Sequence, residues 1–132
     1  MRYEFSENLQ STAEEISLIL FPHVRIENVK CFKSYGTSSK RTIARCHALG
    51  KLMQKALNTQ AHYVLEFLSE RFDKLGEEEK IKVIIHELMH IPKTFGGGFK
   101  HHNFVTDKNV NLHYKTYKNK KEMRQRNENF FK

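Results

Sequence analysis

The segment from residue 76 to residue 92, GEEEKIKVIIHELMHIP, constrains the fold more than any other part of the chain. Its apolar residues recur at the three- and four-residue spacing of one helix face. Gly76 is a tolerable N-cap, and the three glutamates that follow it lie where the helix dipole favours negative charge. Pro92 cannot continue a helix. We therefore predict a helix over about residues 77–91 with one face buried in a core.

The other predicted elements give an α+β domain. An amphipathic helix is expected over residues 7–20, with Ser6 or Ser11 as its N-cap. Residues 24–33 and 41–49 read as two extended segments, and the polar turn between them favours a hairpin. The most strand-like stretch is 61–70, which is rich in aromatic and branched residues. A sheet of about three strands follows, with residues 50–60 left as a short helix or a loop.

The length and composition of the chain indicate one soluble domain. The chain has 132 residues, 39% of them hydrophobic and 29% charged. No run of eighteen apolar residues is present, so we expect no contact with a membrane. The polar N-terminus does not resemble a secretory signal, which predicts a cytoplasmic protein. In that compartment Cys31 and Cys46 are expected as free thiols.

The net charge of +8 is the first indication of a partner, because a basic surface attracts nucleic acid or acidic proteins. The excess is largest after residue 114, where seven basic residues face two glutamates. We divide the chain into a catalytic-type domain, residues 1–114, and a basic C-terminal helix or tail, residues 115–132. The tail is either solvated or a contact for nucleic-acid phosphates.

Two histidines on the helix over 77–91 have the spacing of metal ligands. His86 and His90 lie one turn apart, about 40° from each other around the helix axis, and Glu87 lies about 100° from His86. Both imidazoles can aim a nitrogen at one ion about 2.0–2.1 Å away, and Glu87 can reach a water bound to that ion. An apolar helix makes an unpaired histidine pair costly to bury. These residues predict a metal site.

A third protein ligand is expected after the helix. Gly96, Gly97 and Gly98 let the chain reverse, which would return His101 or His102 to His90. Neighbouring residues of an extended segment point in opposite directions, so one of the two is expected to bind the metal. Asp107, His113 and Glu122 are other donors in this part of the chain.

The stretch IIHELMHIPKTFGGGFKHHN, preceded by ARCHAL and YVLEFLSERFDKLGEEEKIKVI, resembles the small HELxHIP metallopeptidases of archaea and phages, distant relatives of the SprT-like zincins. The resemblance covers about residues 41–115 and implies a small zincin-like fold. It implies Zn²⁺ bound by His86, His90 and His102, with His101 as the alternative third ligand. It also implies a peptide or protein substrate, hydrolysed by a metal-bound water that Glu87 activates. Zincins bind substrate along an edge strand, for which 61–70 is the candidate.

Two other classes of function stay open. The charge would suit a metal-dependent nuclease, or a nucleic-acid-binding module that the metal merely stabilises. His47 and His62 are expected to be hydrogen-bonded strand residues rather than ligands, although His47 could assist at the cleft. Glu66 could orient a ligand histidine.

Overall fold

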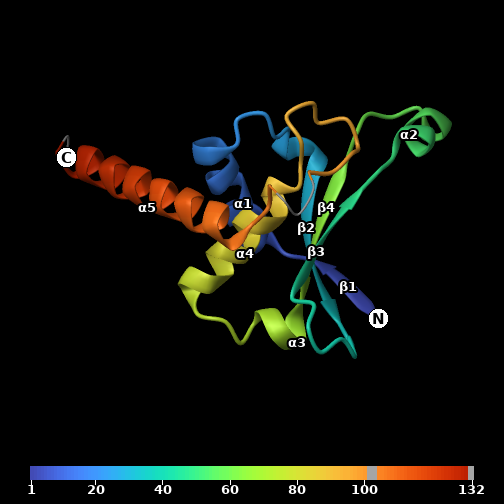
Figure 1. The fold of residues 1–132 in the computed structure, drawn as a ribbon, viewed down its shortest axis with the longest axis horizontal. Helices are drawn as coiled ribbons and strands as arrows, with labels where there is room; N and C mark the ends of the chain where they lie inside the picture. The colour runs from blue at the N-terminus through green and yellow to red at the C-terminus, as the bar shows by residue number, and fades with distance from the viewer. Residues whose placement is uncertain (101–103, 131–132) are drawn as a thin grey trace.

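A computed structural model describes residues 1–100 and 104–130, which form a mixed sheet with helices against one side (Figure 1). The strands are β1 (Arg2–Phe5), β2 (Val29–Tyr35), β3 (Ala44–Ala48) and β4 (Tyr63–Leu68). The helices are α1 (Glu7–Leu20), α2 (Lys51–Leu57), α3 (Ser69–Phe72), α4 (Glu77–Met89) and α5 (Asp107–Phe130), with a 3₁₀ turn η1 (Ile26–Asn28). The predicted α+β class and the N-terminal helix are confirmed.

The sheet has four strands in the order β1-β2-β4-β3, where about three were predicted. β1 and β2 are antiparallel, β2 and β4 parallel, and β3 and β4 antiparallel. The additional strand is β1, whose four residues are all exposed. It has no buried apolar face, so its sequence lacks the pattern by which a strand is recognised.

The hairpin predicted between residues 24–33 and residues 41–49 is wrong. β4 lies between β2 and β3 and pairs with both. Five of the six residues of β4 are buried, whereas β3 alternates between half-buried and exposed residues. The most apolar strand therefore occupies the interior of the sheet, where a neighbouring strand covers each of its two edges. β3 is left at the edge.

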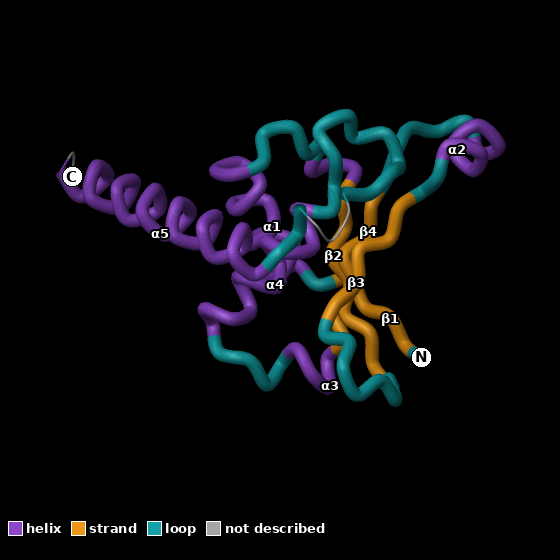
Figure 2. The backbone as a smooth tube through the Cα atoms, viewed as in Figure 1, coloured by secondary structure: helices purple, strands orange, loops and turns teal. Residues whose placement is uncertain are grey.

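The helical layer covers one face of the sheet (Figure 2). Ser6 caps α1 through a 3.2 Å bond from the Leu9 N–H, as predicted, and Ala13 and Ile16 of α1 are fully buried. Ile85 and Leu88 of α4 are fully buried in the same core as Leu65 and Phe67 of β4. α4 ends at Met89, two residues before the predicted end, and the Ile91 N–H reaches back only three residues to Leu88. This burial fixes α4 against the sheet.

The basic C-terminal segment is helical. α5 begins at Asp107, and its far half projects from the body (Figure 1). Its near half is attached to α1, where the Tyr117 hydroxyl donates to Glu15 at 2.7 Å and Lys121 lies 3.2 Å from the same carboxylate. The proposed boundary between residues 114 and 115 falls within α5, and the division into two parts stays a prediction.

Two further predictions concern the described part of the chain. No helix in residues 1–100 and 104–130 is long and apolar enough to cross a membrane. Cys31 and Cys46 are free cysteines, as expected.

Candidate metal centre

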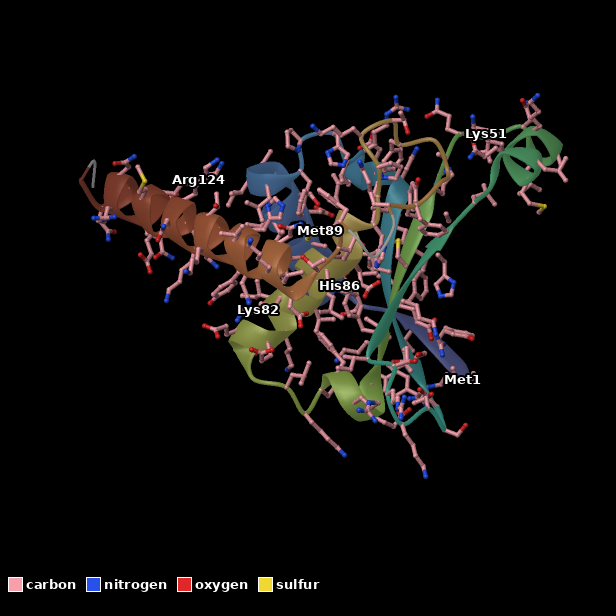
Figure 3. The ribbon with its side chains drawn as sticks, viewed as in Figure 1. Met1, Lys51, Lys82, His86, Met89 and Arg124 are labelled. Carbon is pink, nitrogen blue, oxygen red and sulfur yellow. The ribbon has the colours of Figure 1, made fainter. Side chains whose placement is uncertain are left out.

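α4 and its C-cap bring His86 and His90 together at the side that faces β3. Figure 3 labels His86 on this side of α4. Their Nε2 atoms are 3.4 Å apart. Two nitrogens that each lie about 2.05 Å from one ion, at the tetrahedral angle, are separated by about 3.3 Å. The two imidazoles therefore fit a tetrahedral metal ion without rearrangement of α4.

The ring of His90 is held by the main chain of Lys100. The Lys100 N–H donates to the His90 carbonyl at 2.8 Å, and the Lys100 carbonyl lies 3.1 Å from His90 Nδ1. A carbonyl only accepts, so Nδ1 carries a proton, and in the neutral ring the lone pair is then on Nε2, the nitrogen that lies next to His86 Nε2. A hydrogen bond of this kind is the usual support of a histidine ligand. The predicted return of the chain to His90 is therefore seen at Lys100.

The return depends on the glycine turn and on Tyr63. Gly97 has a φ of +101°, and a Cβ atom there would lie 2.5 Å from Gln54 Nε2 and 2.6 Å from the Leu49 carbonyl oxygen. The Tyr63 hydroxyl accepts from the Gly97 N–H at 2.9 Å and donates to the Gly98 carbonyl at 2.8 Å. A buried strand residue thus fixes the turn that positions Lys100.

Glu87 lies beside the histidine pair and is buried, with 6% of its surface exposed. Its Oε2 atom is 4.0 Å from His86 Nε2. Burial raises the pKa of the Glu87 carboxyl to about 7, because the charged form loses its hydration. A cation at the neighbouring imidazoles would oppose this shift by favouring the carboxylate. The carboxyl is placed to exchange a proton with a molecule bound next to the histidines.

His86 lies where two cavities meet, and His90 lines one of them. One, of about 560 Å³, extends toward Arg41 and the start of α5. The other, of about 430 Å³, extends toward Phe99 and Lys100. Ala44, His86 and Glu87 line both. The cavities together form a cleft between α4 and the edge strand β3, with His86 and Glu87 at the junction.

The sequence predicts a third ligand from the segment that follows Lys100. His101 and His102, the two candidates, are not among the described residues. Within the described residues, no group of three histidine, cysteine or acidic side chains could hold a metal. Asp107 lines the cleft, whereas His113 packs on Phe21 with ring centroids 5.1 Å apart. Glu122 is exposed on α5.

The other polar strand residues have partners of their own. His47 Nε2 lies 2.7 Å from Glu66 Oε1, and both side chains project from the sheet face opposite α4. The expectation that Glu66 orients a ligand histidine is therefore wrong: its partner is His47. His62 bonds the Thr59 hydroxyl at 3.2 Å, so its predicted hydrogen bond is present, although His62 lies just before β4 and not within it.

Sequence reasoning missed Tyr63 and the Lys100 main chain as supports of the site. Tyr63 looked like one more aromatic strand residue, and a main-chain contact leaves no trace in residue identity. The glycine run was the available signal, since three glycines in a row indicate a tightly constrained backbone.

An α+β domain with an HExxH helix beside an edge strand has the arrangement typical of metal-dependent hydrolases. A model of the family described as "putative phage metallopeptidase" matches residues 1–126. The chain belongs to this family, which implies a metal and a protein substrate. Neither a curated protein nor a solved structure gives a match.

Proposed function

We propose that the protein is a zinc-dependent peptide-bond hydrolase. The observation that carries the proposal is the 3.4 Å separation of His86 Nε2 and His90 Nε2, next to the buried Glu87 and inside the cleft along β3. Zinc is the ion whose nitrogen ligation and tetrahedral geometry match this pair. His102 is proposed as the third ligand and His101 as its alternative.

The chemistry is divided between the ion and Glu87. When bound, the ion would polarise the scissile carbonyl and lower the pKa of the attacking water. Glu87 accepts the proton of that water and then donates it to the leaving amine. His90 is kept in the required tautomer by the Lys100 carbonyl. The cleft walls hold the substrate next to these groups.

The substrate is proposed to pair with β3. The Leu49 N–H donates to the His62 carbonyl, and the Leu68 N–H donates to the Ile43 carbonyl. In an antiparallel pair such bonds recur at every second residue, so the main-chain groups of Ala44, Cys46 and Ala48 point away from β4. An extended peptide can add itself to this edge. Strand 61–70, the candidate from sequence, cannot serve, because β4 is paired on both sides.

The test is Glu87→Gln in zinc-loaded protein, with a mixture of unstructured peptides as substrate. We expect zinc to remain bound and peptide cleavage to fall by about a hundredfold or more, the scale of general-base catalysis. Glu79→Gln is the matched control, since it also removes a carboxylate from the cleft wall. Equal cleavage by the wild type and Glu87→Gln would refute the proposal.

The second candidate is a metal-dependent nuclease, or a nucleic-acid-binding module that a metal stabilises. It is favoured by the exposed basic side chains of α5, among them Lys118, Arg124 and Arg126. Nucleic acid bound by this helix would make log Kd depend steeply on salt. Cleavage of an oligonucleotide that Glu87→Gln abolishes, with peptides left intact, would favour the nuclease. Binding without any Glu87-dependent hydrolysis would favour the module.

A further inference from the structure

The sheet has a second face that the helices leave bare. α1, α4 and α5 lie together on the opposite side (Figure 1). In an ordinary half-solvated sheet the outer face carries polar residues. Here the outer positions of β1 are aromatic, Tyr3 and Phe5, and they are 59% and 46% exposed. The sheet register aligns them with further aromatic and basic residues.

Cross-strand partners on this face form three rows. The first row joins the exposed Tyr3 to Ser34 and Leu68, which are both fully buried. The second joins Phe5, Phe32, Glu66 and Arg45, from β1 to β3. The third joins Lys30, Val64 and His47. We call these residues the outer face.

The aromatic part of the outer face is a ready-made stacking surface. Phe5 and Phe32 contact edge to face, with ring centroids 5.8 Å apart and planes at 74°. Tyr3 lies two residues from Phe5, so their Cα atoms are about 7 Å apart along β1. Flat apolar rings on an exposed strand stack well against other flat rings.

The basic part of the outer face is held in place by Glu66. This carboxylate is 4% exposed and lies 2.7 Å from His47 Nε2 and 3.6 Å from Arg45 Nη1. The Arg45 and His47 side chains themselves remain about half exposed, at 43% and 53%. Lys30, in the next row, is also exposed. Cationic and imidazole groups are therefore exposed on the same face of the sheet as the aromatic rings, on β2 and β3.

We propose that the outer face binds single-stranded nucleic acid, with bases on Tyr3 and Phe5 and phosphates at Lys30 and Arg45. Aromatic rings and cations on one exposed sheet surface match the two parts of a nucleotide. A second copy of the chain is disfavoured, because it would set Lys30 and Arg45 against the same cations. This function is separate from hydrolysis and needs no metal.

The test is fluorescence anisotropy of labelled oligothymidylate and oligouridylate, about 15 nucleotides long, with full-length protein in EDTA. We expect the double variant Tyr3→Ala/Phe5→Ala to bind about tenfold more weakly or worse, as loss of base stacking requires. Tyr3→Phe keeps the ring and should bind like the wild type. Lys30→Gln should reduce the slope of log Kd against log salt by about 1, the contribution of one phosphate contact. Tighter binding of oligouridylate would indicate RNA as the ligand, and tighter binding of oligothymidylate would indicate DNA.

The matched control is Arg124→Gln/Arg126→Gln, which removes two exposed charges from α5 and leaves the outer face intact. Circular dichroism confirms that each variant folds. Unchanged affinity in Tyr3→Ala/Phe5→Ala, with loss confined to the α5 variant, would overturn the proposal. Absence of binding by the wild type at low salt would also overturn it. Neither result bears on peptide cleavage, so the two proposals fail separately.

Discussion

His86 Nε2 and His90 Nε2 lie 3.4 Å apart at the C-terminal end of α4, a separation that suits two ligands of one tetrahedral ion. The helix and its C-cap place the two side chains on one side, and the Lys100 main chain holds the His90 ring. The protonation of His90 is set from outside the helix, by the Lys100 carbonyl. The positions of the two histidines thus depend on the helix, and the protonation of His90 depends on the glycine turn that places Lys100.

The third ligand is predicted to follow Lys100 by two residues. We expect the purified protein to bind about one zinc ion, His102→Ala to lose it and His101→Ala to keep it, because a zinc held by two histidines alone lacks a ligand. Metal analysis after dialysis measures this. His62→Ala, whose side chain bonds Thr59, is the control for a histidine outside the site. Zinc lost from His101→Ala and kept in His102→Ala would reverse the assignment.

Gly97→Ala is predicted to destabilise the fold by about 2 kcal/mol or more, because a side chain there meets both a positive φ and the Leu49 carbonyl. Zinc affinity should fall with it, since the turn positions Lys100. Gly98→Ala is the matched control, as a Cβ there meets nothing within 4 Å. Urea unfolding and zinc titration measure both effects. Equal stability of the two variants would contradict this account of the turn.

The contact between Glu15 and Tyr117 predicts a pH dependence. The hydrogen bond from Tyr117 lowers the pKa of the Glu15 carboxyl from 4.5, helped by Lys121 and opposed by partial burial. A carboxyl whose pKa is lower in the folded protein stabilises the fold above its unfolded pKa. That contribution is lost as the pH falls through the lower, folded value.

A double-mutant cycle of Glu15→Gln and Tyr117→Phe measures this contribution. Because Glu15 is substantially exposed, we expect a coupling free energy of only about 1 kcal/mol at pH 7. It should begin to decline at about pH 4.5, where the carboxyl of the unfolded chain becomes protonated, and should vanish below the lower pKa of the folded protein. A coupling that stays constant down to pH 2 would show that the carboxylate charge is not involved.

Pairing of the substrate with β3 predicts different effects of proline at adjacent positions. Ala44→Pro removes an outward N–H and should raise KM for peptides with little loss of stability. Arg45→Pro removes an N–H that faces β4 and should destabilise the sheet itself. Peptide kinetics and thermal unfolding of both variants measure this. An unchanged KM in Ala44→Pro would exclude pairing through that N–H.

The sequence by itself determined the helix of His86 and His90, because helical periodicity, a capping position and a stopping proline are all local. It also determined α1 and the family of the protein. Only the tertiary structure decided the sheet order, since the choice between β3 and β4 as the edge depends on which strand gains more by burial on both sides. The hydrogen bonds of Tyr63 and Lys100 were likewise decided by packing. They join residues that lie from 10 to 35 positions apart in the chain, and no local pattern encodes such contacts.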